Sequence, residues 1–333
     1  MNVFQNFKTI VLLLFLLVSS TAKAKEKDPN YTCPNNHILE LLPCDLCGCS
    51  TSSGSFGFGT LSNANFIGVR YIYQNFESRY GIFDNSPKSK ETFSTYQIWA
   101  QVPLNDKFYV TTNVPYQDLT REFQGSKENL NGLGDISAIG WYKLQFFKKQ
   151  KTDGFTVDFN ATKEPSGHSL QFGIGVKLPT GQFEEALANN VNPGFQVGTG
   201  SVDGIFSLGY NYGSDKIGVN TLMSYYLKGE NKNEYQFGNQ FSYSANVYTF
   251  FSTKKMNIMP FAGISGDVYD TITQYGETLQ DTDGDILNAS FGSELAVEKF
   301  IFGASYTLPI QQNLFGDNVE SKQRFSVYVN FAL

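Results

Sequence analysis

The last nine residues of the chain, 325–333, alternate strictly between two kinds of side chain. Phe325, Val327 and Val329 belong to an apolar set, whereas Ser326 and Asn330 belong to a polar or mixed set. Successive side chains of a β-strand point to opposite faces, so this segment predicts a strand with one apolar face. The alternation recurs along most of the chain. It predicts an all-β fold, a transmembrane antiparallel up-and-down β-barrel of about twelve strands.

Turn residues and the alternation together delimit twelve candidate strands. Their expected extents are 65–80, 91–104, 106–118, 133–148, 168–180, 199–213, 216–228, 234–252, 256–272, 286–298, 299–314 and 321–333. Links after odd-numbered strands are long, including 119–132 and 315–320, and most of the others are short. Short periplasmic turns and longer outer loops are typical of outer-membrane barrels. The first strand is therefore expected to begin, and the last strand to end, on the periplasmic side. The long link 148–167 breaks this pattern.

Composition and the N-terminus indicate the compartment. Lys8, an apolar run over 10–18 and the sequence Ala22-Lys-Ala24 are typical of a secretory signal peptide, residues 1–24. We expect a Cys-rich periplasmic segment with a Gly/Ser linker over 25–64, and an outer-membrane barrel over 65–333. Outer-membrane lipid is then one partner. A soluble β-sandwich is the competing interpretation, but twelve long strands with many outward aromatic residues favour the barrel. The formal net charge of −6 argues against nucleic-acid partners.

The segment before the barrel carries the most specific chemical feature of the sequence. It contains Cys33, His37, Cys44, Cys47 and Cys49. Exported chains usually oxidise paired cysteines, so two disulfides are one interpretation. Thiolates with one imidazole also suit copper(I) or zinc, which makes a metal site the alternative. No other cofactor is expected.

Three further segments carry a family resemblance. They are Asn131-Gly-Leu-Gly-Asp135, Gly175-Val-Lys-Leu-Pro-Thr-Gly181 and Pro193-Gly-Phe-Gln-Val-Gly-Thr-Gly-Ser-Val-Asp203. In this order they resemble the outer-membrane transporter family named for a phenol-degradation (meta-cleavage) pathway, over roughly 65–333. The resemblance implies a monomeric barrel that moves small, often hydrophobic, organic molecules. The Cys-rich segment is not part of the family pattern.

Parity places four charged residues, Arg70, Asp135, Lys177 and Asp203, on the inward face of their strands. A charge that faces lipid at the bilayer midplane costs about 2–4 kcal/mol, which favours the inward position. Two interpretations remain open for these residues. They form either a lumen network that selects solute or a set of structural ion pairs that fills a narrow barrel.

No catalytic motif is present, with neither G-x-S-x-G nor H-E-x-x-H in the sequence, so we do not expect an enzyme. The expected function is an outer-membrane channel or transporter for small molecules, hydrophobic ones among them. The alternatives are a copper- or zinc-handling receptor that uses the Cys-rich segment, and a purely structural barrel. The alternating last strand also predicts the barrel-assembly machinery as a partner, because its loss leaves an unpaired barrel edge in lipid.

Overall fold

The computed structural model describes residues 61, 65–79, 86–146, 167–187, 192–214, 216–253 and 256–333, all within one compact unit, Leu42–Leu333. The strands in this part of the chain are β1 (Phe66–Arg79), β2 (Lys88–Pro103), β3 (Phe108–Phe123), β4 (Ser126–Leu133), β5 (Ile136–Gln145), β6 (Gly167–Leu178), β7 (Asp203–Gly213), β8 (Ile217–Leu227), β9 (Tyr235–Gln236), β10 (Gln240–Thr249), β11 (Phe251–Ser252), β12 (Met256–Tyr269), β13 (Thr273–Gln274), β14 (Glu277–Thr278), β15 (Gly284–Val297), β16 (Phe300–Leu314) and β17 (Val319–Ala332). None of the described residues forms a helix with the length and apolarity to cross a membrane.

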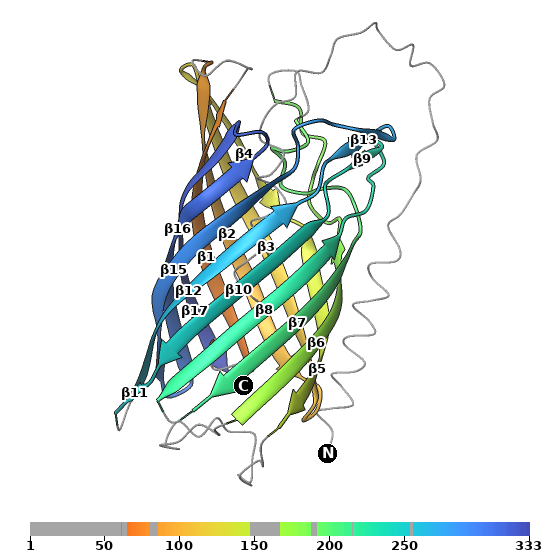
Figure 1. Ribbon diagram of the computed structural model, residues 1–333. Helices are drawn as coiled ribbons and strands as arrows, with labels where there is room; N and C mark the ends of the chain where they lie inside the picture. The colour runs from red at the N-terminus through yellow and green to blue at the C-terminus, as the bar shows by residue number, and fades with distance from the viewer. Residues whose placement is uncertain are drawn as a thin grey trace, which may run out of the picture. The chain divides into compact units, whose positions relative to one another are not determined.

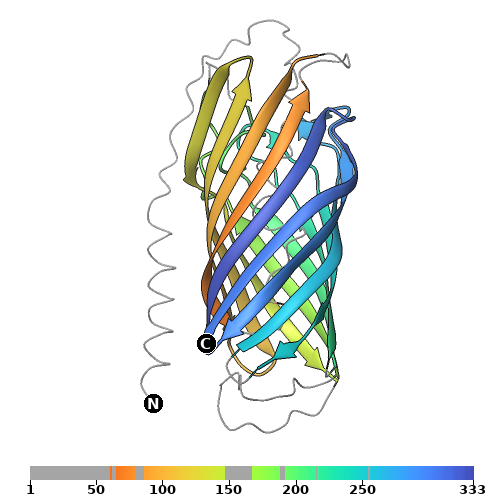
Figure 2. The same cartoon turned by 90° about the vertical axis from the view of Figure 1, so that its left-hand side faces the viewer.

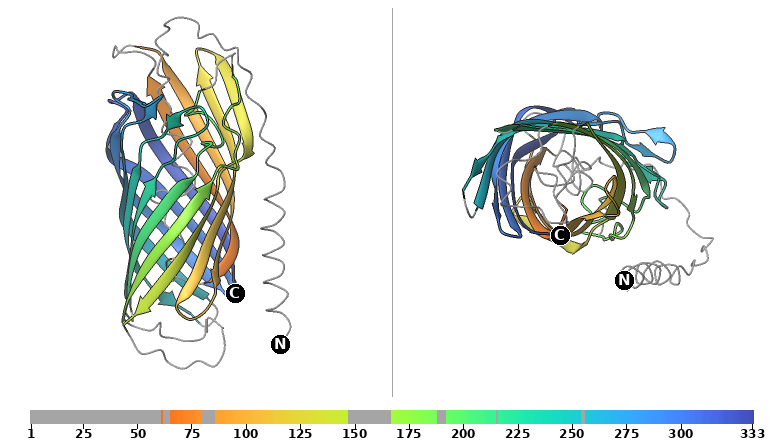
Figure 3. Two further views of the ribbon diagram at one scale, coloured as in Figure 1. Left: turned by 90° about the vertical axis from the view of Figure 1, so that its right-hand side faces the viewer. Right: turned by 90° about the horizontal axis from the view of Figure 1, so that it is seen from below.

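The long strands close into a barrel of twelve antiparallel positions (Figures 1 and 2). Each strand pairs with its neighbour in the chain, and β1 closes the ring by pairing with β17, from Phe66 opposite Ala332 upward. β4 and β5 share one position because both pair with β3. The view from below in Figure 3 shows the closed ring. The prediction of an antiparallel barrel of about twelve strands is confirmed.

The two ends of the barrel differ in their connections. Both barrel termini and the short turns 104–107, 214–216 and 298–299 lie at one end, the lower end in Figure 1. Following the usual orientation of outer-membrane barrels, this is the periplasmic end, and the opposite end is the outer end. At the outer end, β9, β13 and β14 form a separate three-stranded sheet beyond the wall.

The outward face of the wall is apolar. Ile174, in the middle of β6, is 69% exposed, and Val329 of β17 is also exposed, whereas Lys177 and Asn330 on the same strands are buried. The outward set also includes Val69, Ile98, Phe172, Phe206, Val247, Ile264, Phe291, Phe302 and Phe325. A continuous exposed band of this kind is stable only against lipid, so the fold is a membrane barrel.

The structure corrects the expected loop over 119–132. β3 continues to Phe123, the chain turns at Gln124 and Gly125, and β4 returns beside it. Both turn residues have positive φ, 48° and 83°, as a tight hairpin of two residues requires. Alternation does not reveal this hairpin, because beyond the buried pair of Leu119 and Leu130 most of its side chains are polar on both faces.

Other boundaries also differ from the expectation. The expected strand 133–148 is interrupted at Gly134, where β4 ends and β5 begins two residues later. The expected strand 234–252 divides into β9, β10 and β11, and the expected outer loop 315–320 is a short turn of 315–318. β7 begins only at Asp203, because the residues before it fold into the barrel. Most of the link 148–167 lies outside the described residues.

Ile174→Arg is expected to lower the free energy of unfolding by about 2–4 kcal/mol, since it places a cation against lipid near the middle of a strand. Denaturant titration of the protein in lipid bilayers measures this loss. Leu104→Arg is the matched control, because Leu104 is exposed in a periplasmic turn outside the strands. Equal effects of the two substitutions would contradict the assignment of β6 to the membrane.

Candidate functional site

The link between β6 and β7 folds into the outer end of the barrel in the parts that the structure describes, residues 179–187 and 192–202. Phe195 is 0% exposed and lies 6.0 Å from the ring of Phe93 on β2, measured between ring centroids. The guanidinium carbon of Arg121 on β3 lies 4.1 Å from the centroid of the Phe195 ring. The link therefore reaches inside the outer end of the barrel from β6 and β7 to β2 and β3.

Phe195 belongs to an apolar cluster inside the outer half of the barrel. Side chains from β1, β2, β3, β4, β12, β15, β16 and β17 contribute to it, together with residues of the outer links. Its buried members are Phe76, Phe93, Leu119, Leu130, Phe195, Val197, Tyr235, Phe237, Tyr269, Ile272, Ile286, Leu314, Phe315 and Val319. The inward face of the barrel is therefore apolar in this region, in contrast to the four charged residues that parity places inside.

Arg121 is held in position by an acidic partner. Its Nε lies 3.3 Å from Oε1 of Glu91, and both side chains are almost completely buried. Ser78 and Ser89 donate hydrogen bonds to the same carboxylate, at 3.1 and 3.0 Å. This set orients the guanidinium toward the ring of Phe195, where a cation above an aromatic face is attracted to it.

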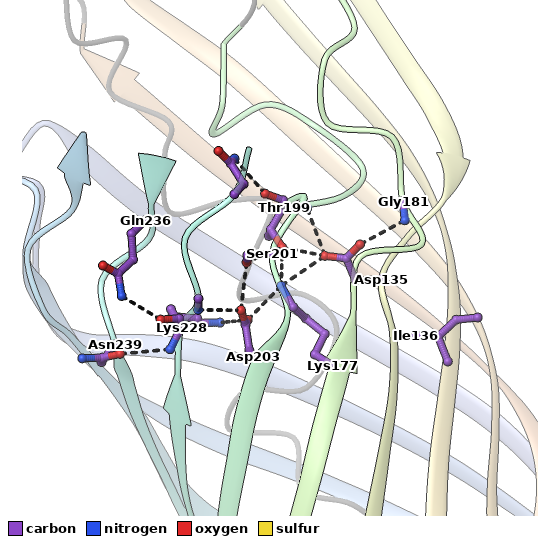
Figure 4. A network of polar contacts seen from close by, with 12 residues as sticks. Asp135, Ile136, Lys177, Gly181, Thr199, Ser201, Asp203, Lys228, Gln236 and Asn239 are labelled. Atoms are coloured by element: carbon purple, nitrogen blue, oxygen red, sulfur yellow. Dashed lines mark hydrogen bonds and ion pairs between the residues drawn. The ribbon is translucent and has the colours of Figure 1, made fainter. Parts of the chain in front are cut away.

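A charge network lies on the other side of the link, at the outer ends of β5, β6, β7 and β8 (Figure 4). We define it by Asp135, Lys177, Asp203 and Lys228. Lys177 Nζ lies 3.1 Å from Asp135 Oδ2 and 2.8 Å from Asp203 Oδ2. Lys228 Nζ lies 3.5 Å from the same Asp203 oxygen. All four side chains are buried, so the two cations and two carboxylates balance one another away from solvent.

The charge network also fixes both ends of the β6–β7 link. Asp135 accepts hydrogen bonds from the backbone N–H of Gly181 at 3.0 Å and of Thr199 at 2.9 Å. The Thr199 hydroxyl donates to Asp135 as well, at 2.7 Å. Ser201 donates to Asp203 at 2.8 Å. The two ends of the link are thus held beside the wall, while Phe195, in the middle part of the link, contacts Phe93.

The backbone geometry at the two ends of the β6–β7 link requires glycine at several motif positions. The backbones of Gly181 and Gly198 are in contact, and a Cβ on Gly198 would lie 2.4 Å from the carbonyl oxygen of Gly181. Gly200 adopts a φ of +73°, which L side chains rarely adopt. A side chain at these positions would force the two ends of the link apart.

On its exposed side, the β6–β7 link is also joined to the link between β8 and β10 by polar contacts of Glu184. The carboxylate of Glu184 pairs with Lys232 on the link between β8 and β10, and it accepts a 2.9 Å hydrogen bond from Asn233. The hydrogen bond from Lys232 lowers the pKa of Glu184 below its ordinary value. The two outer links therefore stay joined at neutral pH, and the tie weakens only when Glu184 is protonated in acid.

Arg70 is buried but lies apart from the charge network, near the periplasmic end. Its Nε donates to Gln97 at 2.7 Å, and its guanidinium carbon lies 4.3 Å from the centroid of Trp99. On the same end, Glu294 accepts the backbone N–H of Leu61 at 2.9 Å and a hydrogen bond from the Tyr328 hydroxyl. Asp135, Lys177 and Asp203 therefore meet, while Arg70 does not join them. Parity identified the face of each residue but not its height along the barrel axis.

The proposed metal or disulfide residues, Cys33, His37, Cys44, Cys47 and Cys49, lie outside the described residues. Within the described residues, no group of three His, Cys, Asp or Glu side chains has the arrangement of a metal site.

Intact mass under non-reducing conditions, with elemental analysis of the same sample, distinguishes disulfides from bound copper or zinc in the Cys-rich segment. Two bridges without metal are one expected outcome, and metal on free thiols is the other. Four free thiols without metal would contradict both interpretations.

Comparison with solved structures places the barrel among outer-membrane proteins. An outer-membrane channel from Pseudomonas putida F1 aligns with a TM-score of 0.59 and 11% identity, over 84% of this chain and 98% of that chain. The β-domain of the Bordetella autotransporter BrkA aligns with a TM-score of 0.45 and 9% identity, over 81% and 100% of the two chains. The closed barrel, its apolar exterior and the first of these matches agree on the outer membrane as the location of the protein.

Comparison of the sequence with known proteins gives one assignment. No curated protein matches the chain. The model of a protein family does match, over residues 90–310, which is more than half of the sequence. The matched region contains all three motif segments and most of the wall of the barrel. The chain therefore belongs to the family described as "Putative MetA-pathway of phenol degradation".

Proposed function

We propose that the protein is an outer-membrane channel for small organic molecules, hydrophobic ones among them. The apolar cluster inside the outer mouth is the observation that carries this proposal. The interior of a water-filled porin is polar, whereas here the first interior surface that a solute meets from outside is apolar. The similar barrel from Pseudomonas putida is described as an outer-membrane channel, which supports the same role.

The wall beneath the apolar cluster narrows the class of solute. On four of the strands that contribute to the cluster, the next inward position carries a neutral hydrogen-bonding group: Gln74 below Phe76, Thr95 below Phe93, Gln117 below Leu119 and Asn288 below Ile286, all buried. On β12 it carries the buried carboxylate of Asp267, below Tyr269, which accepts hydrogen bonds from Gln240 and Ser242. A solute that crosses the barrel meets an apolar zone first and an amide- and hydroxyl-lined zone second. Molecules with an apolar body and at least one hydrogen-bonding group suit both zones.

The β6–β7 link makes this channel a gated one. Phe195 occupies the outer mouth, so solute passes only when the link moves away from Phe93 and Arg121. The charge network keeps the ends of the link attached during that motion. We infer that opening is a displacement of the link within the barrel rather than a separation of strands.

Uptake of the hydrophobic fluorophore N-phenyl-1-naphthylamine by intact cells tests the proposal. Cells that produce the protein are expected to take up the probe faster than cells that produce an unrelated closed barrel at the same level. Swelling of proteoliposomes in a neutral sugar provides the second arm, in which slow entry is expected because the mouth is apolar. Uptake equal to that of the control in both arms would favour the purely structural barrel.

A further inference from the structure

A cleft of about 550 Å³ opens at the outer end of the barrel, between the last rungs of the wall and the small outer sheet. β10 and β12 are joined up to the bond from the Asp270 N–H to the Asn239 carbonyl, 2.8 Å long. Beyond this hydrogen bond, the segment before β10 and the segment after β12 pair again, where β9 meets β13. The ladder is interrupted between these two points, and residues on both sides of the interruption line the cleft. Its volume is in the range of pockets that bind small molecules.

The floor of the cleft is apolar and leads directly to the interior. Phe237 and Tyr269 line the cleft, and both are buried members of the apolar cluster. Val268 adds an exposed aliphatic side chain from the outward face of β12. A ligand in the cleft therefore rests on the outer side of the same side chains that line the mouth of the channel.

The rim of the cleft is acidic. Asp270 and Asp283 both line it and both are exposed. No described cation pairs with either carboxylate. Two amide atoms at the rim are occupied: Gln236 Nε2 donates to the Lys228 carbonyl at 2.7 Å, and Asn239 Oδ1 accepts the Lys228 N–H at 3.0 Å. The two carboxylates only accept hydrogen bonds, and they are the charged side chains that line the cleft.

We propose that this cleft is a capture site for small molecules that carry an apolar ring or chain and a cationic amine. The apolar body packs against Phe237 and Tyr269, and the ammonium group lies between the carboxylates of Asp270 and Asp283. This inference rests on the proposed channel function, because it names where that channel first binds solute and which charge it prefers. Carboxylate ligands of the same size are disfavoured by repulsion at the rim.

Binding of three probes that share a phenyl ring tests the site: 2-phenylethylamine, 2-phenylethanol and phenylacetate. The full chain is held in nanodiscs of zwitterionic lipid, and empty nanodiscs correct for partition into lipid. Affinity is measured by saturation-transfer NMR titration at low and high salt. The amine is expected to bind about fivefold more tightly than the alcohol at low salt, with the difference reduced at high salt. Phenylacetate is expected to bind most weakly.

Two variants locate the effect. Asp270→Asn combined with Asp283→Asn is expected to reduce the preference for the amine to less than about twofold, because both charges are removed with little change in shape. Glu277→Gln is the control, since Glu277 is an exposed carboxylate of the same link that does not line the cleft. Equal binding of amine and alcohol, or a preference that survives the double substitution, would overturn the proposal.

The outcome is separable from the test of channel function. Probe uptake by cells without amine preference in the binding assay would leave the channel in place and reject the capture site. Amine binding that depends on Asp270 and Asp283, without any uptake, would keep the site and reject the channel.

Discussion

Phe195→Ala is expected to raise the single-channel conductance of the barrel in planar bilayers severalfold. The substitution removes the ring that fills the space between Phe93 and Arg121. Truncation of a buried phenylalanine costs about 3–5 kcal/mol of packing. Each ~1.4 kcal/mol changes an equilibrium constant tenfold, so even part of this loss shifts the link strongly toward its displaced position.

Phe183→Ala is the matched control for this measurement. Phe183 lies on the same link but is only half-buried, on the side where Lys232 lies 5.3 Å from its ring centroid. Its truncation removes an equal volume without emptying the mouth, so conductance near that of the unmodified protein is expected. Equal conductance of the Phe195→Ala variant and the unmodified protein would show that the ring does not obstruct the pathway.

Lys177→Met is expected to cause the second large effect, a loss of about 3–5 kcal/mol in the free energy of unfolding. The substitution leaves Asp135 and Asp203 buried near each other, with Lys228 as their remaining close cation. Urea titration in lipid bilayers, followed by the heat-dependent shift in gel migration, measures the loss. The β6–β7 link is expected to detach as well, because the carboxylate of Asp135 loses the cation with which it pairs.

Lys127→Met provides the comparison for the charge network. Lys127 pairs with Glu122 at 3.8 Å on the exposed outer hairpin, where an ion pair contributes about 0–1 kcal/mol. A double substitution, Lys177→Met with Asp203→Asn, is expected to cost less than the sum of the two single substitutions, because the uncompensated charge is then removed. A loss below about 1 kcal/mol for Lys177→Met alone would show that the network contributes little to the stability of the barrel.

The fold was accessible from the sequence because lipid selects one face of every strand. Residues such as Ile174 and Val329 must be apolar, and their period of two gives both the strands and their orientation. The charged residues of the motifs were found in the same way, since an inward position is the only one that tolerates them. Strands beyond the lipid escape this selection, which explains the missed hairpin of β3 and β4.

The interior was less accessible, for a physical reason that individual residues illustrate. Phe76 and Phe93 have inward parity on strands whose other inward residues are mostly polar, and this mismatch was a signal that could have been used. Phe195 lies in one of the three motifs, but no alternation indicates its burial, because it lies in a link and packs against strands distant in the sequence. Lys228 joins the network differently, as the cross-strand neighbour of Asp203 beyond the Gly204–Leu227 pair of β7 and β8.

The contact between Gly181 and Gly198 has a consequence for how the channel changes over evolutionary time. The two glycines close the link into a loop that leaves the wall at one point and returns to it at the same point. The wall beside it is complete without the loop, because β6 and β7 pair with each other from Lys177 and Asp203 downward. Substitutions between the two glycines therefore alter what the mouth admits without changing how the barrel is assembled in the membrane. The loop can therefore vary in sequence while the strands that carry it keep their pairing.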